Sequence, residues 1–142
     1  MYHFDAAGRH LRSIATISGQ NAYTFGYDAA GRLITVTDRD GDSTHIERNA
    51  AGHPTAIVAP DGQRTTLTVN AQGYLATVIN PAGEAYVMTY TTDGLLTAFT
   101  TPRGHVNHFT YDALGRLVHD LNAGAGAGRS PIPKTPAAIR TV

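Results

Sequence analysis

The sequence predicts an all-β fold in which tandem antiparallel β-hairpins, each repeat about 21 residues long, form a sheet strip. Three observations support this prediction: glycines recur at a fixed spacing, segments of strand composition lie between them, and turn-forming residues precede each glycine. A fixed period of this size indicates a repeat architecture. No segment of ten or more residues has helical periodicity, so essentially no helix is expected.

The glycine register defines the repeat. Six glycines close turns of one kind, and the first interval, from Gly8 to Gly31, is two residues longer than the four equal intervals that follow. A second set of five lies about midway between them, so each repeat holds two turns, and we expect about five hairpins over residues 1–122. The first set is Gly8, Gly31, Gly52, Gly73, Gly94 and Gly115, and the second is Gly19, Gly41, Gly62, Gly83 and Gly104.

The residues before these glycines have the chemistry of tight turns. In the turn at residues 28–31, the Asp28 side chain can accept a hydrogen bond from the backbone two residues further on. The next two residues suit a type I turn, and Gly31 takes the left-handed conformation that closes it. Several midway turns carry proline at their second position, where its fixed φ suits the same geometry.

Residues 65–69, 86–90 and 107–111 have strand composition, in which apolar residues alternate with threonine and other polar residues. This alternation places the apolar side chains on one face of each strand. The other strand of each repeat carries two apolar columns that lie three positions apart. Either this strand contains a β-bulge, or its leucine still belongs to the turn. The columns are Leu33, Leu75, Leu96 and Leu117, and Val36, Ile57, Val78 and Phe99.

The composition excludes several classes of protein. Eleven Lys and Arg residues balance eleven Asp and Glu residues, so the chain lacks the basic excess of a nucleic-acid binder. The absence of Cys excludes a disulfide scaffold, a thiolate zinc site and a cysteine nucleophile. No apolar run is long enough to predict a membrane span, and the first residues lack the apolar segment of a signal peptide. From residue 123 the repeat stops, and we expect residues 123–142, rich in Gly, Ala and Pro, to form a disordered tail.

Two seven-residue segments, Y-D-A-A-G-R-L at 27–33 and Y-D-A-L-G-R-L at 111–117, are almost identical, and residues 4–9 are a near copy. This motif resembles the signature of the YD-repeat, or RHS-repeat, family, and the resemblance covers residues 1 to about 121. The middle copies keep the glycine but lose the aspartate or the arginine, so an Asp–Arg pair cannot be general. The structural motif residues are Tyr27, Asp28, Gly31, Arg32 and Leu33, and Tyr111, Asp112, Gly115, Arg116 and Leu117.

The resemblance implies a function. In Rhs polymorphic toxins, insecticidal toxin complexes and teneurins, such repeats form a curved, twisted sheet strip that builds a hollow shell, and in the toxins the shell encloses a C-terminal toxin domain. The chain has too few repeats for a full shell and lacks a D-P-x-G-type motif, so we expect a non-catalytic piece of shell wall. The expected partners are further YD repeats or a toxin domain of the same or a neighbouring chain, and the family implies secretion or a cell-surface location. No cofactor is expected.

Other interpretations remain open beside this one. The exposed sheet face, with Tyr23, Tyr74 and Tyr86, is an alternative binding surface for carbohydrate or a cell surface. An enzymatic alternative, a remnant of an aspartyl self-protease, has no residue in its favour. Because a hairpin strip has two open edges, we also expect the isolated chain to be marginally stable or to self-associate.

Metal binding is disfavoured by the local sequence. Asp38, Asp40 and Asp42 alternate as calcium ligands can, but they occupy an ordinary turn and lack a matching bidentate glutamate. His105 and His108 lie three residues apart, which places them on opposite faces of a strand. We therefore expect no metal site.

Overall fold

The computed structural model of the chain describes residues 1–122, which form twelve β-strands and no helix. The strands follow one another in the sheet in chain order, from β1 to β12, and their pairing is antiparallel. The all-β prediction of tandem hairpins is thereby confirmed. The disordered tail predicted for residues 123–142 lies outside the described residues.

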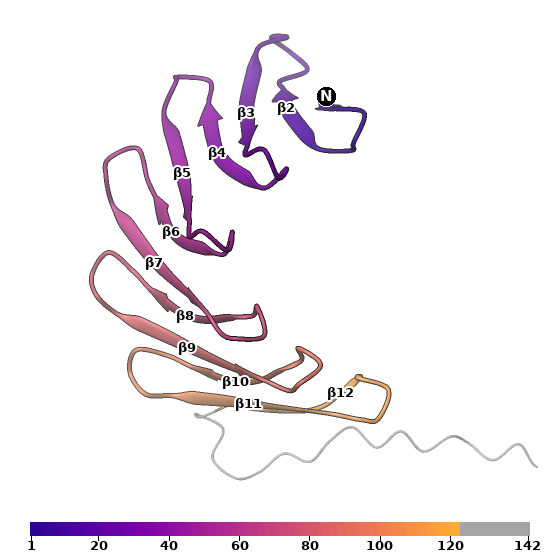
Figure 1. Ribbon diagram of the computed structural model, residues 1–142, viewed down its shortest axis with the longest axis vertical. Helices are drawn as coiled ribbons and strands as arrows, with labels where there is room; N and C mark the ends of the chain where they lie inside the picture. Colours follow the sequence, from indigo (N-terminus) through magenta and orange to yellow (C-terminus); the bar gives the residue numbers. More distant parts are fainter. Residues whose placement is uncertain (123–142) are drawn as a thin grey trace, which may run out of the picture. The chain divides into compact units, whose positions relative to one another are not determined.

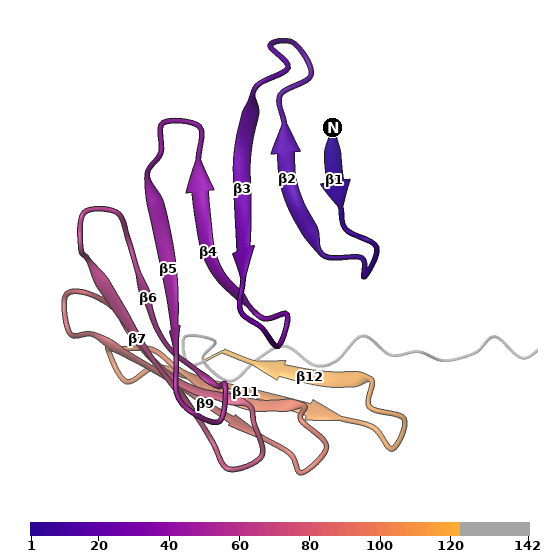
Figure 2. The same ribbon diagram turned by 45° about the horizontal axis from the view of Figure 1, so that its top comes forward.

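The chain divides into two compact units, Met1–Val87 and Met88–Val142, and the boundary falls inside β9. Within the first unit, successive strands lie side by side (Figures 1 and 2). Its strands are β1 (Tyr2–Phe4), β2 (His10–Ile14), β3 (Asn21–Tyr27), β4 (Leu33–Asp38), β5 (Ser43–Arg48), β6 (Pro54–Val58), β7 (Arg64–Val69) and β8 (Leu75–Ile79). Strand β9 (Ala85–Tyr90) crosses the boundary, and β10 (Leu96–Thr100), β11 (Val106–Tyr111) and β12 (Leu117–Leu121) belong to the second unit.

The number of hairpins differs from the expected number of about five. The twelve strands of the described residues form six consecutive pairs, because the short strand β1 already pairs with β2. The near copy of the motif at residues 4–9 supplies a complete turn between them: Gly8 N–H donates to the Asp5 carbonyl at 3.0 Å. A complete signature turn is thus present in the first hairpin, although β1 has only three residues.

The turns have the conformation that their sequences predict. Within residues 1–122, eleven turn glycines have φ between 68° and 93°, the left-handed region that residues with a Cβ rarely adopt. In the turn between β3 and β4, Asp28 N–H donates to the Arg32 carbonyl and Gly31 N–H donates to the Asp28 carbonyl, both at 2.9 Å. The same two backbone hydrogen bonds recur in the turns that begin at Asn49 and Asn70.

The register gives the sheet an apolar face and a threonine-rich face. On one face, Phe25 lies opposite Val36, Ile46 opposite Ile57, and Leu67 opposite Val78. On the other face, threonines lie opposite each other, as Thr24 with Thr37 and Thr68 with Thr77. Cross-strand apolar pairs of this kind are the main side-chain stabilisation of a two-sided sheet.

A β-bulge beside five of the signature turns explains the odd spacing of the two apolar columns. Gly26 pairs with Thr35 whereas Tyr27 pairs with Leu33, so Ile34 is the extra residue. Similar register shifts occur in the β1–β2, β5–β6, β7–β8 and β11–β12 pairs. The bulge alternative is therefore correct, and Leu33 already belongs to the strand.

The longer first repeat carries two extra residues in separate places. The loop between β2 and β3 closes from Ala15 to Gln20, one residue longer than the midway turns such as Asp38 to Asp42. A second register shift lies between Ser13 and Ile14, where the pairing leaves one additional residue in β3. The extra length is thus absorbed at one end of a single hairpin, and the pairing of β3 with β4 follows the pattern of the later repeats.

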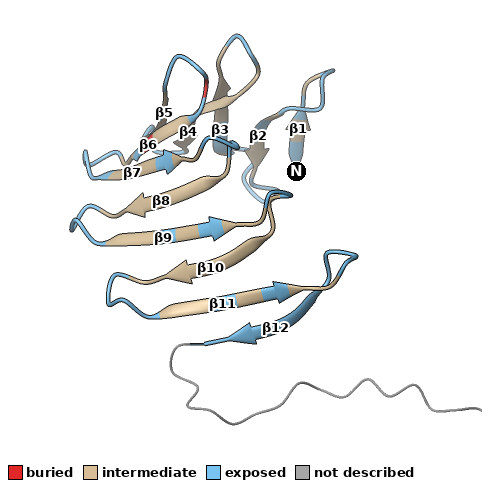
Figure 3. Ribbon diagram, turned by 60° about the horizontal axis from the view of Figure 1, so that its bottom comes forward, coloured by how far each residue is buried: buried red, intermediate tan, exposed pale blue. Residues whose placement is uncertain are grey.

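The sheet has almost no closed core within the described residues. Ala56 is the one hydrophobic residue that is fully buried, and most strand positions are intermediate (Figure 3). In β12, every residue is exposed, and Leu121 is 59% accessible. A single layer covers its apolar side chains only with neighbouring strands, so the predicted marginal stability or self-association of the isolated chain stays a prediction.

Candidate functional site

The signature aspartate organises its own turn. One carboxylate oxygen of Asp28, Oδ1, accepts hydrogen bonds from the N–H groups of Ala30 and Arg32, both at 2.9 Å. The other, Oδ2, accepts from Arg32 Nε at 2.8 Å. Asp5 and Asp112 make the same three hydrogen bonds in their own turns. Turn closure and positioning of the arginine therefore depend on one side chain.

These hydrogen bonds also fix the charge of the aspartates. The N–H of the arginine four residues further on lowers the pKa of Asp5, Asp28 and Asp112, and the guanidinium of the same arginine lowers it further. Hydrogen bonds that favour the charged form have this effect. The three carboxylates are consequently anions at neutral pH, each beside a guanidinium.

Degenerate copies keep the turn and lose the arginine. Asn70 uses its amide oxygen to accept from the N–H groups of Gln72 and Tyr74, at 3.1 and 2.9 Å. Thr91 uses its hydroxyl oxygen to accept from Leu95 N–H at 3.0 Å. Asparagine and threonine thus replace the turn function of aspartate, whereas among the signature turns a guanidinium four residues later is present only where aspartate is.

The signature arginine reaches the next repeat. The Arg9 guanidinium carbon lies 5.6 Å from the ring centre of Tyr27, a cation–π distance, and its Nη1 lies 3.4 Å from the point where a Cβ on Gly31 would be. The Arg32 guanidinium occupies the very space that a Cβ on Gly52 would take. Each of these arginines therefore packs on the turn glycine of the following repeat.

The signature tyrosine contacts the preceding repeat. Tyr27 donates its hydroxyl hydrogen to the His10 carbonyl at 2.7 Å, and Tyr111 donates to the Leu96 carbonyl at 2.8 Å. His10 and Leu96 are the first residues of β2 and β10, so the two acceptors are equivalent positions. At these two positions the tyrosine column thus joins a hairpin to the one before it.

Arg48 stands in the tyrosine column and takes over this contact. Its Nη2 donates to the Leu33 carbonyl at 3.0 Å, and Leu33 is the first residue of β4. Its Nη1 donates to the Gly52 carbonyl at 3.0 Å. The sequence shows Arg48 as a break in an apolar column, but its guanidinium makes the same inter-repeat bond as a tyrosine hydroxyl.

The remaining motif residues have simpler roles. Arg116 holds Asp112 at 2.8 Å, and its side chain is 73% accessible. Leu117 begins β12 opposite Tyr111 and is 54% exposed. The midway glycines close turns next to open space; no atom lies within 4 Å of a Cβ built on any of them: Gly19, Gly41, Gly62, Gly83 and Gly104.

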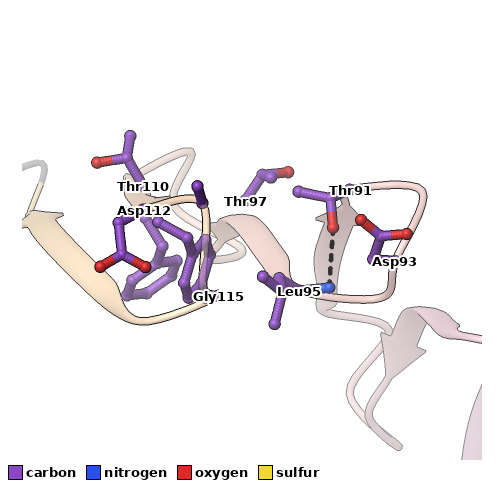
Figure 4. Close-up of a pocket in the computed structure, with 10 residues that line it drawn as sticks. Thr91, Asp93, Leu95, Thr97, Thr110, Asp112 and Gly115 are labelled. Atoms are coloured by element: carbon purple, nitrogen blue, oxygen red, sulfur yellow. Dashed lines mark hydrogen bonds between the residues drawn. The ribbon is translucent and has the colours of Figure 1, made fainter.

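An open pocket of about 630 Å³ lies in the second unit, between the turn after β9 and the turn after β11 (Figure 4). Leu95 lies between the two turns, with Asp112 on one side of it and Asp93 on the other. The aromatic side chains of Phe109 and Tyr111 also line the pocket. Among the motif residues named from the sequence, the pocket brings together Tyr111, Asp112 and Gly115.

The structure does not assemble the alternative sites. Asp38 Oδ1 accepts from the N–H groups of Asp40 and Asp42, at 2.9 and 3.0 Å, as a turn residue does. Among residues 1–122, no group of three or more His, Cys, Asp or Glu side chains could hold a metal ion. The same part of the chain holds no helix of the length and apolarity that a membrane crossing needs.

The three tyrosines proposed for carbohydrate binding do not form one surface. Tyr23 belongs to β3 and Tyr86 to β9, while Tyr74 lies in the turn before β8. Six strand spacings separate β3 from β9, roughly 29 Å along a flat sheet. A sugar ring is far smaller than this separation, so carbohydrate binding remains a prediction without a shared site.

Comparison with known proteins identifies a family and a fold. The family model described as "Teneurin YD-shell" matches residues 1–127. The Tc holotoxin pore of Photorhabdus luminescens, with a substitution in TccC3, is 18% identical, with a TM-score of 0.55 over 70% of this chain and 5% of that chain. The TcdB2-TccC3-Cdc42 structure is 16% identical, with a TM-score of 0.57 over 84% of this chain and 7% of that chain. The structure of TcdB2-TccC3 without its hypervariable C-terminal region is 16% identical, with a TM-score of 0.56 over 84% of this chain and 7% of that chain.

At these identities the solved structures establish the fold alone. The chain spans only 5% to 7% of the length of the solved chains that it matches. None of the curated proteins matches the sequence significantly. The family match, by contrast, covers most of the chain.

Proposed function

The chain belongs to the teneurin YD-shell family, and from this we propose that residues 1–122 are a non-catalytic section of a shell wall that encloses a toxin domain. The solved neighbours are components of Tc toxin complexes, which supports the extension from shell repeat to toxin enclosure. The proposal assigns the twelve strands to the wall and assigns no chemistry to any single repeat.

The observation that carries the proposal is the chain of contacts between successive repeats. Tyr27 bonds to the repeat before it, and Arg32 packs on the glycine of the repeat after it. Arg48 repeats the tyrosine contact with another side chain. Contacts that recur at equivalent positions build a structure of any length, whereas catalysis needs one unique arrangement of groups.

The sheet of a shell wall is a single layer, so no second sheet packs on either of its faces. The single-layer sheet of this chain agrees with such a role. The apolar pairs, such as Leu67 with Val78, are only half buried, and side chains of the same sheet provide what cover there is. Enclosed polypeptide or further repeats would supply the missing contacts. The partners that follow are further YD repeats and a toxin domain of the same or a neighbouring chain.

Limited proteolysis of the full polypeptide that contains these repeats tests the proposal. A wall variant, Gly73→Val, disrupts an interior turn, and Ile17→Ser changes a fully exposed loop side chain as the matched control. We expect cleavage of the toxin segment to be about tenfold faster in the Gly73→Val variant than in the wild type and the control. Equal cleavage rates in all three proteins would contradict an enclosing role.

A further inference from the structure

The space above a signature turn glycine accommodates a guanidinium group. In two successive repeats, the arginine of the preceding turn fills this space: Arg9 lies against Gly31, and Arg32 lies against Gly52. At the first of these positions the guanidinium also faces the ring of Tyr27 at 5.6 Å. The chain therefore shows twice which chemical group this location accepts.

In the last described repeat the arginine is missing but its surroundings are retained. Tyr111 and Gly115 are equivalent to Tyr27 and Gly31, but Leu95 stands where the preceding turn would carry arginine. Leu95 Cδ1 lies 3.6 Å from the Cβ position of Gly115, so the shorter side chain touches the edge of the space. What remains is the pocket of about 630 Å³ shown in Figure 4.

The charges of this pocket favour a cation. Two carboxylates line it, Asp93 and Asp112, and no Lys, Arg or His of the described residues does. Arg116 neutralises one of them from outside the lining, through Asp112 Oδ2 at 2.8 Å. The Asp93 carboxylate is therefore the one negative charge left without a guanidinium among the lining residues, which also include Tyr111. A flat cation gains from a carboxylate and from an aromatic face.

We propose that the pocket formed by Leu95, Tyr111, Gly115 and the carboxylates of Asp93 and Asp112 binds the guanidinium group of an arginine side chain from another polypeptide segment. A guanidinium is favoured over an ammonium because it is planar and stacks on an aromatic ring while donating to carboxylates. A peptide arginine lacks the α-carboxylate that Asp93 and Asp112 would repel and the α-ammonium that they would attract, so free arginine is the comparison that identifies the source. This inference does not depend on toxin enclosure.

Titration of the ¹⁵N-labelled full chain with N-acetyl-arginine methylamide, followed by NMR, tests the proposal. We expect saturable shifts of the Gly94, Tyr111 and Gly115 amides with a dissociation constant in the millimolar range, as an open, partly hydrated site allows. The lysine and citrulline analogues separate planarity from charge, and each should bind at least about fivefold more weakly. Free L-arginine should also bind more weakly than the methylamide.

Two variants check the location. Leu95→Arg supplies the guanidinium within the chain and should abolish binding, whereas Asp93→Asn removes the surplus charge and should weaken binding severalfold. The amide signal of Gly104, which lies in the same unit but not in the pocket lining, reports whether each variant is folded. Ile17→Ser is the control and should bind like the wild type.

Several outcomes would overturn the proposal. Equal chemical-shift changes with the citrulline analogue would show that the positive charge does not matter for binding. Equal changes with the lysine analogue would show that the planar shape of the guanidinium does not matter. Tighter binding of free arginine would exclude a polypeptide source. Unchanged binding by the Asp93→Asn variant would show that the arginine analogue does not bind in this pocket. This conclusion would hold even if the Leu95→Arg variant failed to fold.

Discussion

The contact of Arg32 with Gly52 can be isolated with two alanine substitutions in adjacent repeats. Gly52 and Gly73 have nearly the same backbone conformation, with φ of 85° and 90°, and both close turns that begin with asparagine. Their Cβ positions differ: a Cβ on Gly52 would fall on the Arg32 guanidinium, whereas nothing lies within 4 Å of a Cβ on Gly73. Gly73→Ala therefore measures the backbone cost alone, and Gly52→Ala measures it together with the lost contact.

The magnitudes follow from these two costs. A residue with a Cβ in the left-handed region costs about 1–2 kcal/mol, and this applies to both variants. Displacing the guanidinium from Gly52 uncovers roughly 20–40 Å² of surface, which adds about 0.5–1 kcal/mol at about 25 cal/mol/Å². With a urea m-value of about 2 kcal/mol/M, Gly73→Ala should lower the unfolding midpoint by about 0.5–1 M and Gly52→Ala by a further ~0.2–0.5 M.

Urea unfolding of both variants, in the wild-type and the Arg32→Ala background, forms the test. In the Arg32→Ala background the guanidinium is absent, so the two alanine substitutions should have equal effects on the midpoint. A difference that persists in this background would show that the two turns differ for another reason. Equal effects in the wild-type background would mean that the packing of Arg32 on Gly52 contributes nothing.

Further predictions concern single contacts. Gly73→Val should lower the urea midpoint more than Asp28→Ala, because water can replace the exposed hydrogen bonds of Asp28 but cannot relieve a left-handed β-branched residue. Since the pKa of Asp28 is lowered in the folded chain, its contribution to stability is present above the unfolded-state pKa and is lost as the pH falls through the folded-state pKa; Asp28→Asn should flatten this part of the midpoint-against-pH curve. Tyr111→Phe leaves the Leu96 carbonyl without its donor and should cost about 0.5–1.5 kcal/mol in urea unfolding. Arg48→Met removes donors from two carbonyls and should cost about 1–3 kcal/mol, whereas Arg48→Tyr should restore part of this loss.

The turns and strands were accessible from the sequence because their chemistry is local. Asp28 and Gly31 lie within one turn, and the side-chain hydrogen bonds and positive φ that they require depend on a few consecutive residues. The sequence does not decide whether the strand is bulged, because the spacing of Leu33 and Val36 fits either a bulge or a longer turn. Only the pairing of Tyr27 with Leu33 decides between them.

The arginine contacts between repeats do not follow from the sequence, because they join residues far apart in the chain or link one turn to the next. The reach of Arg9 to Tyr27 depends on the strand spacing and on the rotamer of a long side chain, neither of which a motif specifies. A signal was nevertheless present for Arg48, the one strong donor other than tyrosine in the tyrosine column. The pocket likewise had a signal, since Leu95 breaks the arginine register.

The bulge determines how the length of a repeat relates to the face on which its side chains lie. Side chains alternate between the two faces of a sheet with a period of two. A repeat with an odd number of residues, as from Gly52 to Gly73, would therefore place its apolar side chains on opposite faces in successive copies. The bulge contributes one residue per repeat that has no cross-strand partner, such as Ala76 between Leu75 and Thr77. The other residues of the repeat are then even in number, so Ile46 and Leu67 stay on the same face. Extra residues therefore leave the faces unchanged where a loop or a bulge absorbs them, as in the longer first repeat, whereas a single-residue deletion that no loop or bulge absorbs would move the side chains after it to the opposite face.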